Sequence, residues 1–277
     1  MWAYLAILSG LIVIFRENLP SWQNYLFFNF TAAVLAFGAY WYLNASNGWQ
    51  RFIRHIYPLL FFTFLYEESG RLIHLLHPIF FDHLVNRLEM AVWGVYPTIW
   101  LENFYHPWLN EIFMLGYVSY YFLMPTLAVA LYLKNKIQQM DHFMLAVSLA
   151  FYVSYLTFIL FPVEGPRRYL VAFEGKGFWG PVFTPFAKWV IGNFAIHGGC
   201  IPSSHVAAAL VTLILALRFY RKVGLILTPF VITLCIGTFW GRFHYITDTA
   251  TGLILGWFAV VVADLLMARI SGRIVAS

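Results

Sequence analysis

Charged side chains are scarce in this sequence. Only 10% of its 277 residues are Asp, Glu, Lys or Arg, whereas these residues make up about a quarter of soluble domains. There are only two cysteines, too few for a disulfide framework, and neither a low-complexity tract nor an internal repeat occurs. The scarcity of charge excludes an ordinary soluble protein, and no alternation of apolar and polar residues indicates a membrane β-barrel.

Apolar residues dominate instead, at 61% of the chain, and apolar runs of about 20 residues recur along it. A run of that length crosses a bilayer as an α-helix, because a helix satisfies its own backbone hydrogen bonds. The sequence therefore predicts an all-α, polytopic membrane helical bundle of about eight helices. The predicted membrane helices are Trp2–Phe15, Trp22–Leu43, Phe52–Leu76, Leu109–Leu133, His142–Phe161, Pro202–Phe219, Val223–Trp240 and Thr247–Ala268.

Basic residues mark one side of the predicted bundle. They fall in short loops after every second membrane helix, and the positive-inside rule places such loops in the cytoplasm. The long loops at residues 77–108 and 162–201 then lie on the opposite side, and both chain termini are cytoplasmic. Because these loops account for the net charge of +5, the charge indicates no nucleic-acid partner. The basic residues are Arg51, Arg54, Lys134, Lys136, Arg218, Arg221, Lys222, Arg269 and Arg273.

The two long loops contain apolar segments that we do not expect to span. Asp82–Trp93 has the pattern of an amphipathic helix lying on the membrane surface, with Leu84, Leu88 and Ala91 toward the lipid. The stretch at residues 178–196 is apolar enough to resemble a span, but it contains Pro181, Pro185, Lys188, Gly192 and Asn193. Both segments are therefore predicted to lie at the interface.

The stretch Cys200-Ile-Pro-Ser-Ser-His205 has the pattern of a helix start. Pro202 suits the first helical position, where a missing N–H costs nothing, and Ser203 and Ser204 add hydroxyls to a turn with free backbone N–H groups. A helix N-terminus of this kind attracts anions, phosphate above all.

The stretch Arg242-Phe-His-Tyr-Ile-Thr-Asp248 places His244 and Asp248 four residues apart, on one face of a helix. The carboxylate can accept the Nδ1 proton and leave Nε2 free as a nucleophile. His205 and His244 are 39 positions apart, close to the length of two membrane crossings of about 20 residues each. Both histidines should therefore lie at the same face of the membrane.

A third polar stretch precedes these two. The loop Phe161-Pro-Val-Glu-Gly-Pro-Arg-Arg-Tyr169 ends in Arg167 and Arg168, whose planar guanidinium groups match phosphate oxygens bidentately. Anchoring to lipid head groups at the interface is the alternative interpretation of this pair.

These stretches together resemble the three signature motifs of the type 2 phosphatidic acid phosphatase superfamily of membrane phosphatases and phosphotransferases. The first motif is Gly-Pro-Arg-Arg (165–168), the second Pro-Ser-Ser-His (202–205), and the third a histidine with aspartate four residues later (244–248). The likeness extends from Phe52 to Ala268. It implies a six-helix core within a catalytic domain at 52–277, preceded by about two N-terminal membrane helices at 1–51.

The sequence departs from the family pattern at two basic positions. Family members usually carry a lysine several residues before the first-motif arginine, and none precedes Arg167 in its loop. Many also carry an arginine six positions before the third-motif histidine, where this chain has Thr238; Arg242 is the candidate substitute. The direct sequence His244-Tyr245 is similar to the branch containing inositol phosphorylceramide and sphingomyelin synthases.

The resemblance implies a mechanism that agrees with the residue chemistry. His244 attacks phosphorus and forms a phosphohistidine, Asp248 orients it, and His205 protonates the leaving alkoxide and then deprotonates water or an acceptor hydroxyl. A lipid phosphate is the expected substrate, membrane lipids are the expected surroundings, and no cofactor or metal is required. The phosphoryl oxygens are expected to bind Arg167, Arg168, Arg242, Ser203 and Ser204.

Several alternatives stay open at this point. A zinc site is one of them, with ligands drawn from His197, Cys200, His205, His244 and Asp248, although it leaves the serines and arginines without a role. In function, a lipid phosphatase is the first hypothesis. A phosphotransferase that uses a lipid alcohol as acceptor is the second, and a lipid flippase or transporter is the third.

A further polar cluster lies near the end of the Phe52–Leu76 helix, on the side of the motifs. Glu67 and Arg71 are four residues apart and can pair, with His74 one turn later. These three residues form either a structural ion pair within the bundle or a pocket for a head group or acceptor beside the phosphate.

Overall fold

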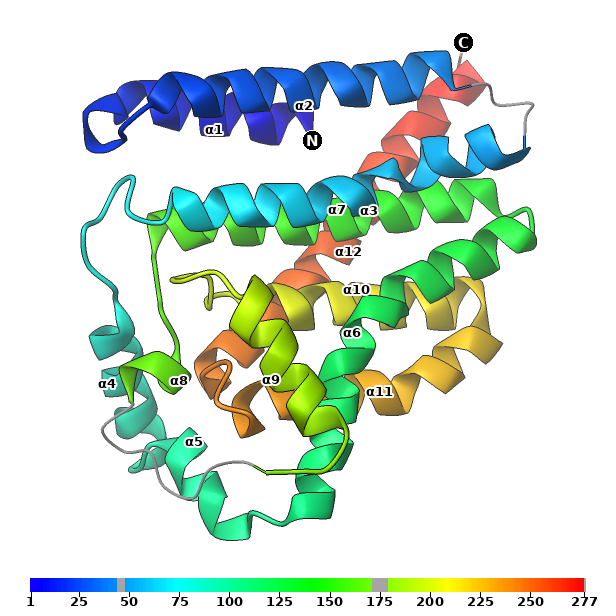
Figure 1. Ribbon diagram of the computed structural model, residues 1–277. Helices are drawn as coiled ribbons and strands as arrows, with labels where there is room; N and C mark the ends of the chain where they lie inside the picture. The colour runs from blue at the N-terminus through cyan, green and yellow to red at the C-terminus, as the bar shows by residue number, and fades with distance from the viewer. Residues whose placement is uncertain (44–47, 171–178, 277) are drawn as a thin grey trace.

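The computed structural model describes residues 1–43, 48–170 and 179–276 (Figure 1). This part of the chain is helical throughout and contains no β-strand, only an isolated bridge between Val163 and Gly199. The predicted all-α class is therefore confirmed. The α-helices are α1 Trp2–Ile14, α2 Trp22–Tyr42, α3 Gly48–Arg71, α4 Asp82–Trp93, α5 Pro97–Trp100, α6 Pro107–Leu133, α7 Ile137–Leu160, α8 Pro166–Tyr169, α9 Phe183–Phe194, α10 Ser204–Phe219, α11 Arg221–Trp240 and α12 Ile246–Ala276, with 3₁₀ turns η1 Arg16–Asn18 and η2 Leu101–Phe104.

Four of these helices are long and apolar enough to cross a membrane: α6, α7, α11 and α12 up to Ile270. Two further apolar helices are shorter, since α1 has 13 residues and α10 has 16. At 1.5 Å per residue, α1 spans only about 20 Å of a hydrocarbon core about 30 Å thick. The predicted spans Trp22–Leu43 and Phe52–Leu76 correspond to α2 and α3. Both helices are long enough to cross a membrane, but aromatic, amide and charged side chains lower their hydropathy below that of the other four.

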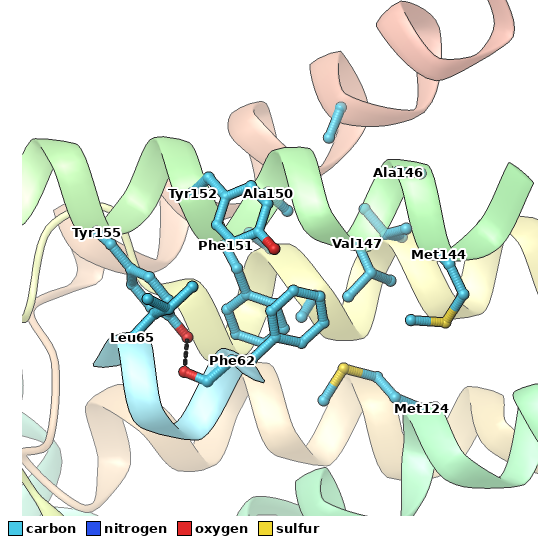
Figure 2. Packing of buried hydrophobic residues seen from close by; sticks show 14 of the residues in the cluster. Phe62, Leu65, Met124, Met144, Ala146, Val147, Ala150, Phe151, Tyr152 and Tyr155 are labelled. Carbon is cyan, nitrogen blue, oxygen red and sulfur yellow. Dashed lines mark hydrogen bonds between the residues drawn. The ribbon is translucent and has the colours of Figure 1, made fainter. Parts of the chain in front are cut away.

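The six helices α3, α6, α7, α10, α11 and α12 pack as a bundle, as the family resemblance implied. Helix α10 contacts α6, α7, α11 and α12, and α3 packs on α7. Figure 2 shows part of the core, where Phe62 of α3 packs against Phe151 of α7 at 4.5 Å between ring centroids. The hydroxyl of Tyr155 donates to the carbonyl of Phe62 at 3.0 Å, so that a buried polar atom is satisfied.

The N-terminal helices join this core. Helix α1 packs on α2, and α2 packs on α3. Tyr4 stacks on Tyr152 of α7 at 4.8 Å, and Leu8 and Ile12 are fully buried in the same hydrophobic cluster. Helix α1 and the bundle thus share one hydrophobic cluster. The predicted domain boundary at residue 51 stays a prediction.

The two ends of the bundle are formed by different helix ends and turns (Figure 1). The C-terminal ends of α3 and α7 and the N-terminal ends of α10 and α12 lie at one end, near α4 and α8. The α6–α7 and α10–α11 turns and the C-terminal part of α12 lie at the other end. The motif histidines therefore share one end and the basic loops occupy the opposite one.

Both predicted interfacial segments form short helices. Helix α4 has the bounds predicted from the sequence, and Leu84, Leu88 and Ala91 are exposed on it. The predicted segment at 178–196 begins at a residue outside the described part of the chain, and within its described part Phe183–Phe194 form α9, a 12-residue helix that packs on α6. At about 18 Å, α9 is too short to span a bilayer, as expected.

A glycine on α12 allows close approach to the second motif. A Cβ on Gly252 would lie 2.6 Å from the carbonyl oxygen of Ser203 and 3.1 Å from the Cβ of Val206. The neighbouring atom is backbone, so an alanine there requires α12 and the start of α10 to separate.

We therefore expect Gly252→Ala to lower the free energy of unfolding by about 1–3 kcal/mol, and to lower kcat because Ser203 is displaced. Thermal unfolding in detergent and an activity assay measure the two effects. Gly10→Ala on α1 is the matched control, because a Cβ there meets nothing within 4 Å. Equal melting temperatures for the two variants would contradict close packing at Gly252.

Candidate active site

The second motif begins α10, two residues later than predicted, since the helix starts at Ser204 and not at Pro202. Ser203 is the N-cap and accepts the backbone N–H of Val206 at 3.4 Å, so Pro202 precedes the cap and does not occupy the first helical position. The extended backbone of Ser203 brings its side-chain oxygen over the first turn. The backbone N–H of Ser203 donates to the carbonyl of Asp248 at 3.0 Å, which joins the second motif to the third.

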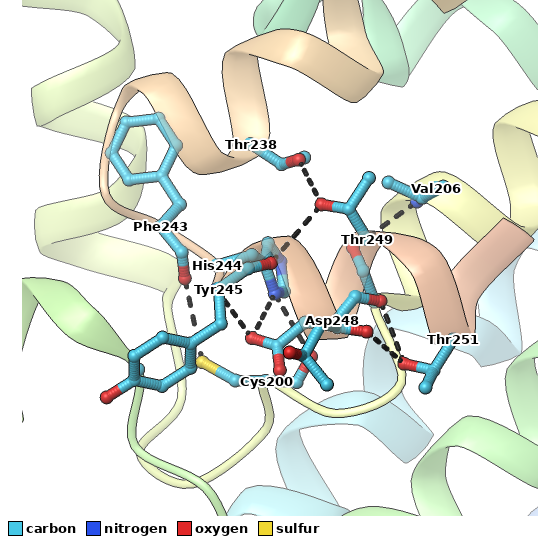
Figure 3. A network of polar contacts seen from close by, with 12 residues as sticks. Cys200, Val206, Thr238, Phe243, His244, Tyr245, Asp248, Thr249 and Thr251 are labelled. Carbon is cyan, nitrogen blue, oxygen red and sulfur yellow. Dashed lines mark hydrogen bonds and ion pairs between the residues drawn. The ribbon is translucent and has the colours of Figure 1, made fainter. Parts of the chain in front are cut away.

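The third motif follows a tight turn at the end of α11. The carbonyl of Thr238 accepts the backbone N–H groups of both Phe243 and His244. The Thr238 hydroxyl contacts that of Thr249 at 2.9 Å, inside the network drawn in Figure 3. The turn buries His244 against the start of α12.

His244 is held through Nδ1, as the sequence predicted, but with an additional partner. Nδ1 lies 3.0 Å from the carbonyl oxygen of Cys200 and 3.5 Å from Oδ2 of Asp248. The same Oδ2 accepts the backbone N–H of Tyr245 at 2.9 Å (Figure 3). Both acceptors favour the tautomer with the proton on Nδ1, which leaves the Nε2 lone pair free.

Burial also affects the protonation of His244. Desolvation lowers the pKa of its imidazole to about 4, although the hydrogen bond to the Cys200 carbonyl acts in the opposite direction. The ring is therefore neutral at pH 7, the form in which an imidazole nitrogen is nucleophilic.

His205 lies beside His244, with 5.8 Å between the ring centroids and 61° between the ring planes. The rings of Tyr117 and Tyr120 on α6 pack against it at 5.6 and 4.4 Å. Its Nδ1 is buried and has no hydrogen-bond partner among the residues that the structure describes. The two histidines predicted to act together are thus neighbours, and the tyrosine rings hold His205 in place.

The arginines come from two loops that are joined to each other. The backbone N–H of Arg167 donates to the carbonyl of Arg242 at 3.0 Å. The side chain of Arg168 reaches the carbonyl of Ile196 at 3.4 Å. Arg242, in the left-handed conformation, forms a buried ion pair with Glu102 of η2. The first and third motifs are adjacent, but the guanidinium groups of Arg168 and Arg242 have protein partners.

A cavity of about 490 Å³ opens beside Ser204 and His205. Its lining is mostly aromatic and apolar, contributed by α3, α6, α7 and α9, and it includes Glu67. Arg71 and His74 are exposed and do not line it. The ion pairs of the described residues do not include Glu67 with Arg71. Of Glu67, Arg71 and His74, only Glu67 lines the cavity beside His205.

Three of the candidate zinc ligands come together: atoms of Cys200, His244 and Asp248 lie within 4.8 Å of one another. His197 is instead exposed and pairs with Glu164 at 2.9 Å. Burial raises the pKa of the Cys200 thiol well above its usual value, so the thiolate that zinc requires is disfavoured. The Nδ1 of His244 and the Asp248 carboxylate are already engaged as described above. The donor set does not fit a zinc site.

Three acidic residues near the motifs were not predicted to belong to the site. Asp82 and Glu89 on α4 and Glu102 on η2 contact residues of the first and third motif loops. A signal for the first two was present, because Asp82, Asn86 and Glu89 recur at helical spacing on a helix predicted to lie on the surface. No comparable pattern surrounds Glu102.

The half-buried His205, the buried His244 and Asp248 and the N-terminus of α10 lie together at one end of the helical bundle, an arrangement suited to phosphoryl transfer. A family model described as the PAP2 superfamily matches residues 85–262, from α4 to α12. The chain therefore belongs to the PAP2 superfamily, the type 2 phosphatidic acid phosphatase superfamily that its motifs resemble. No match to the chain was found among curated proteins or among solved structures.

Proposed function

We propose that this protein removes the phosphoryl group of a lipid phosphate or diphosphate through a phosphohistidine on His244. The main support is the orientation of His244, whose Nδ1 faces the Cys200 carbonyl and Asp248 while Nε2 stays free. The aromatic cavity next to His205 supports a lipid as the leaving alcohol, because an apolar chain gains free energy on entering it.

The proposed reaction has two steps. In the first, the Nε2 lone pair of His244 attacks phosphorus, the bond from phosphorus to the lipid oxygen breaks, and His205 donates a proton to that oxygen. In the second, His205 takes a proton from water, the resulting hydroxide attacks phosphorus, and the P–N bond to His244 breaks. Asp248 stabilises the positive charge that develops on the His244 ring.

The phosphoryl oxygens are proposed to bind where the three motifs meet. The N–H groups at the start of α10 supply donors there, together with the side chains of Arg167, Arg168 and Arg242 once phosphate competes with their protein partners. Such donors stabilise the transition state more than the ground state, because charge moves onto the oxygens they face.

Phosphate release by the purified protein in detergent tests this function. We expect inorganic phosphate to appear from at least one lipid phosphate or diphosphate in a panel that differs in head and chain, with activity unchanged after exhaustive chelation. Release lost on chelation and restored by zinc would refute a metal-independent reaction. Lipid translocation without any phosphate release or transfer would favour the flippase alternative.

The orientation of the site is also a proposal, with the motifs on the non-cytoplasmic side and both termini in the cytoplasm. The distribution of basic residues between the two ends of the bundle supports it. A cysteine placed in the turn between α6 and α7 should resist an impermeant thiol reagent in intact cells, and rapid labelling there would reverse the orientation.

A second candidate function is transfer of a phosphoryl head group to a lipid alcohol. The observation that favours it is the buried ion pair between Glu102 and Arg242, which neutralises a cation that a dianionic monoester needs. A monoanionic diester, the donor in such a transfer, needs less positive charge.

Replacing Glu102 with glutamine is therefore expected to favour monoesters. With Arg242 released from its carboxylate partner, KM for a lipid phosphomonoester should fall about three- to tenfold, a gain of about 1 kcal/mol, typical of a charge-assisted hydrogen bond. The KM for a diester donor should change less. Steady-state kinetics on both substrates measure the ratio, and Glu102→Asp, which keeps the charge, is the control. An unchanged ratio in Glu102→Gln would remove the charge argument for transfer.

A further inference from the structure

Helix α4 turns its polar face inward and its apolar face outward. Asp82 and Glu89 are 0% and 1% exposed and Asn86 is also buried, whereas Leu84 and Leu88 on the opposite face are 41% and 51% exposed. The outward leucines suit a helix lying in the membrane interface. The inward carboxylates need an explanation, because burying a charge is costly unless it is paired and hydrogen-bonded.

Asp82 connects two motif loops. Its Oδ2 accepts the backbone N–H of Glu164 at 2.8 Å and its Oδ1 that of Gly165 at 2.9 Å, at the start of the first motif. Oδ1 also accepts the hydroxyl of Tyr245, next to the nucleophile, at 3.0 Å. Asn86 adds a second bond to that hydroxyl at 2.8 Å. One carboxylate thus spans the first and third motif loops.

Glu89 binds the start of α12 in the same way. Its Oε1 accepts the backbone N–H of Thr247 at 2.9 Å and the Thr247 hydroxyl at 3.2 Å. The N–H groups of a first helical turn have no partner within the helix, and a carboxylate there also complements the helix dipole. Because Asp248 follows Thr247, Glu89 holds the turn that positions the catalytic aspartate.

A carboxylate repels phosphate, so the side chains of Asp82 and Glu89 are not suited to bind the substrate's phosphate directly. Burial raises the pKa of both carboxyl groups, and their hydrogen bonds act in the opposite direction. Both oxygens of Asp82 and Oε1 of Glu89 accept backbone N–H groups and hydroxyls of the motif loops, so these carboxyl groups act on the chemistry through those loops.

We infer that α4 is a clamp in which Asp82 and Glu89 are positioning residues that hold the first and third motif loops in register. The inference deepens the proposed function and rests on it, since register matters for transferring phosphoryl from a substrate held by the first motif to the nucleophile of the third. A misplacement of about 1 Å at a reacting centre can lower the rate a hundredfold.

Steady-state kinetics test the clamp through a split between kcat and KM. Glu89→Ala should lower kcat about 10- to 100-fold, the range typical of residues that orient catalytic groups, with KM changed less than about twofold. Glu89→Gln keeps an oxygen for the Thr247 N–H and should recover most of kcat. Asp82→Asn should keep less of the wild-type kcat than Glu89→Gln, because the single amide oxygen of asparagine cannot accept both the Glu164 and the Gly165 N–H. Arg87→Gln, on the exposed face of α4, is the matched control.

Backbone hydrogen exchange gives a readout that does not require activity. In Asp82→Ala, peptides covering residues 161–169 should exchange faster than in the wild type, and in Glu89→Ala those covering 244–251 should do so. Exchange unchanged in both variants, or Glu89→Gln as impaired in kcat as Glu89→Ala, would overturn the clamp. If the alanine variants do not fold, Asp82→Asn decides by the same two measurements, and wild-type kcat and wild-type exchange at residues 161–169 in that variant would overturn the clamp. A wild-type protein that neither releases nor transfers phosphate would refute the proposed function, while the exchange data would still judge the clamp.

Discussion

Replacing His244 with alanine is expected to abolish the phosphoenzyme and to lower kcat by about 10⁴-fold or more, as loss of a catalytic nucleophile does. The Nε2 of this buried ring is the only nitrogen in the proposed mechanism that attacks phosphorus. Wild-type protein quenched during turnover of a ³²P-labelled substrate should carry an acid-labile, base-stable label, and His244→Ala should carry none.

A surface histidine provides the control for this experiment. His83 is exposed on α4, and His83→Ala should keep both label and activity. A label of the same chemical stability on His244→Ala would assign the nucleophile to another residue. Full activity of His244→Ala would refute the enzyme mechanism altogether.

Replacing His205 with alanine should produce the second-largest loss, and the loss should depend on the leaving group. For an alkyl lipid phosphate, whose alkoxide must be protonated as it leaves, we expect kcat to fall about 10²–10⁴-fold. For 4-nitrophenyl phosphate the first step needs little proton donation, so the phosphohistidine should still form. Its hydrolysis should be slow, because His205 is also the proposed base for water.

A burst of nitrophenolate measures this directly. His205→Ala should release about one nitrophenolate per enzyme and then stall with the label on His244, in line with a covalent intermediate that accumulates. Tyr121→Phe, a substitution in the cavity wall beside the site, is the control and should show no such stall. Equal losses on alkyl and aryl substrates without a burst would show that His205 is not the acid.

The pairing of His244 with Asp248 shows how much of the site can be predicted from residue spacing alone. A four-residue step on a helix brings two side chains to one face, and the structure places them 3.5 Å apart. The nearer acceptor of Nδ1 is the carbonyl of Cys200, 44 residues away along the chain. Any residue type offers a carbonyl, so no pattern of side chains could have identified this partner.

Helix boundaries show the same limit on a smaller scale. The helix start at the second motif was predictable from Pro202 and the two serines, yet the helix begins after Ser203, because the serine hydroxyl caps the first turn better as N-cap than as a helical residue. The predicted surface helix at Asp82–Trp93 was correct in its bounds. Its inward polar face was not interpreted, because the sequence does not show what a polar face will meet.

Glu102 is the clearest residue that sequence reasoning missed. Nothing near it in the chain indicates a site, and it meets Arg242 only because η2 is folded back beside the third motif. Conversely, Arg71 and His74 were natural candidates by spacing, but α3 ends so that both are exposed while Glu67 lines the cavity.

The sequence by itself determined the helical membrane class, the three motifs and the residues His205, His244 and Asp248, because apolar run length and side-chain spacing are local properties of the chain. Only the tertiary structure decided which groups support them. The contacts of Asp82 with Tyr245 and of Glu89 with Thr247 join residues 163 and 158 positions apart. Such contacts depend on how the helices pack, and the packing of α4 against the start of α12 is a property of the whole fold.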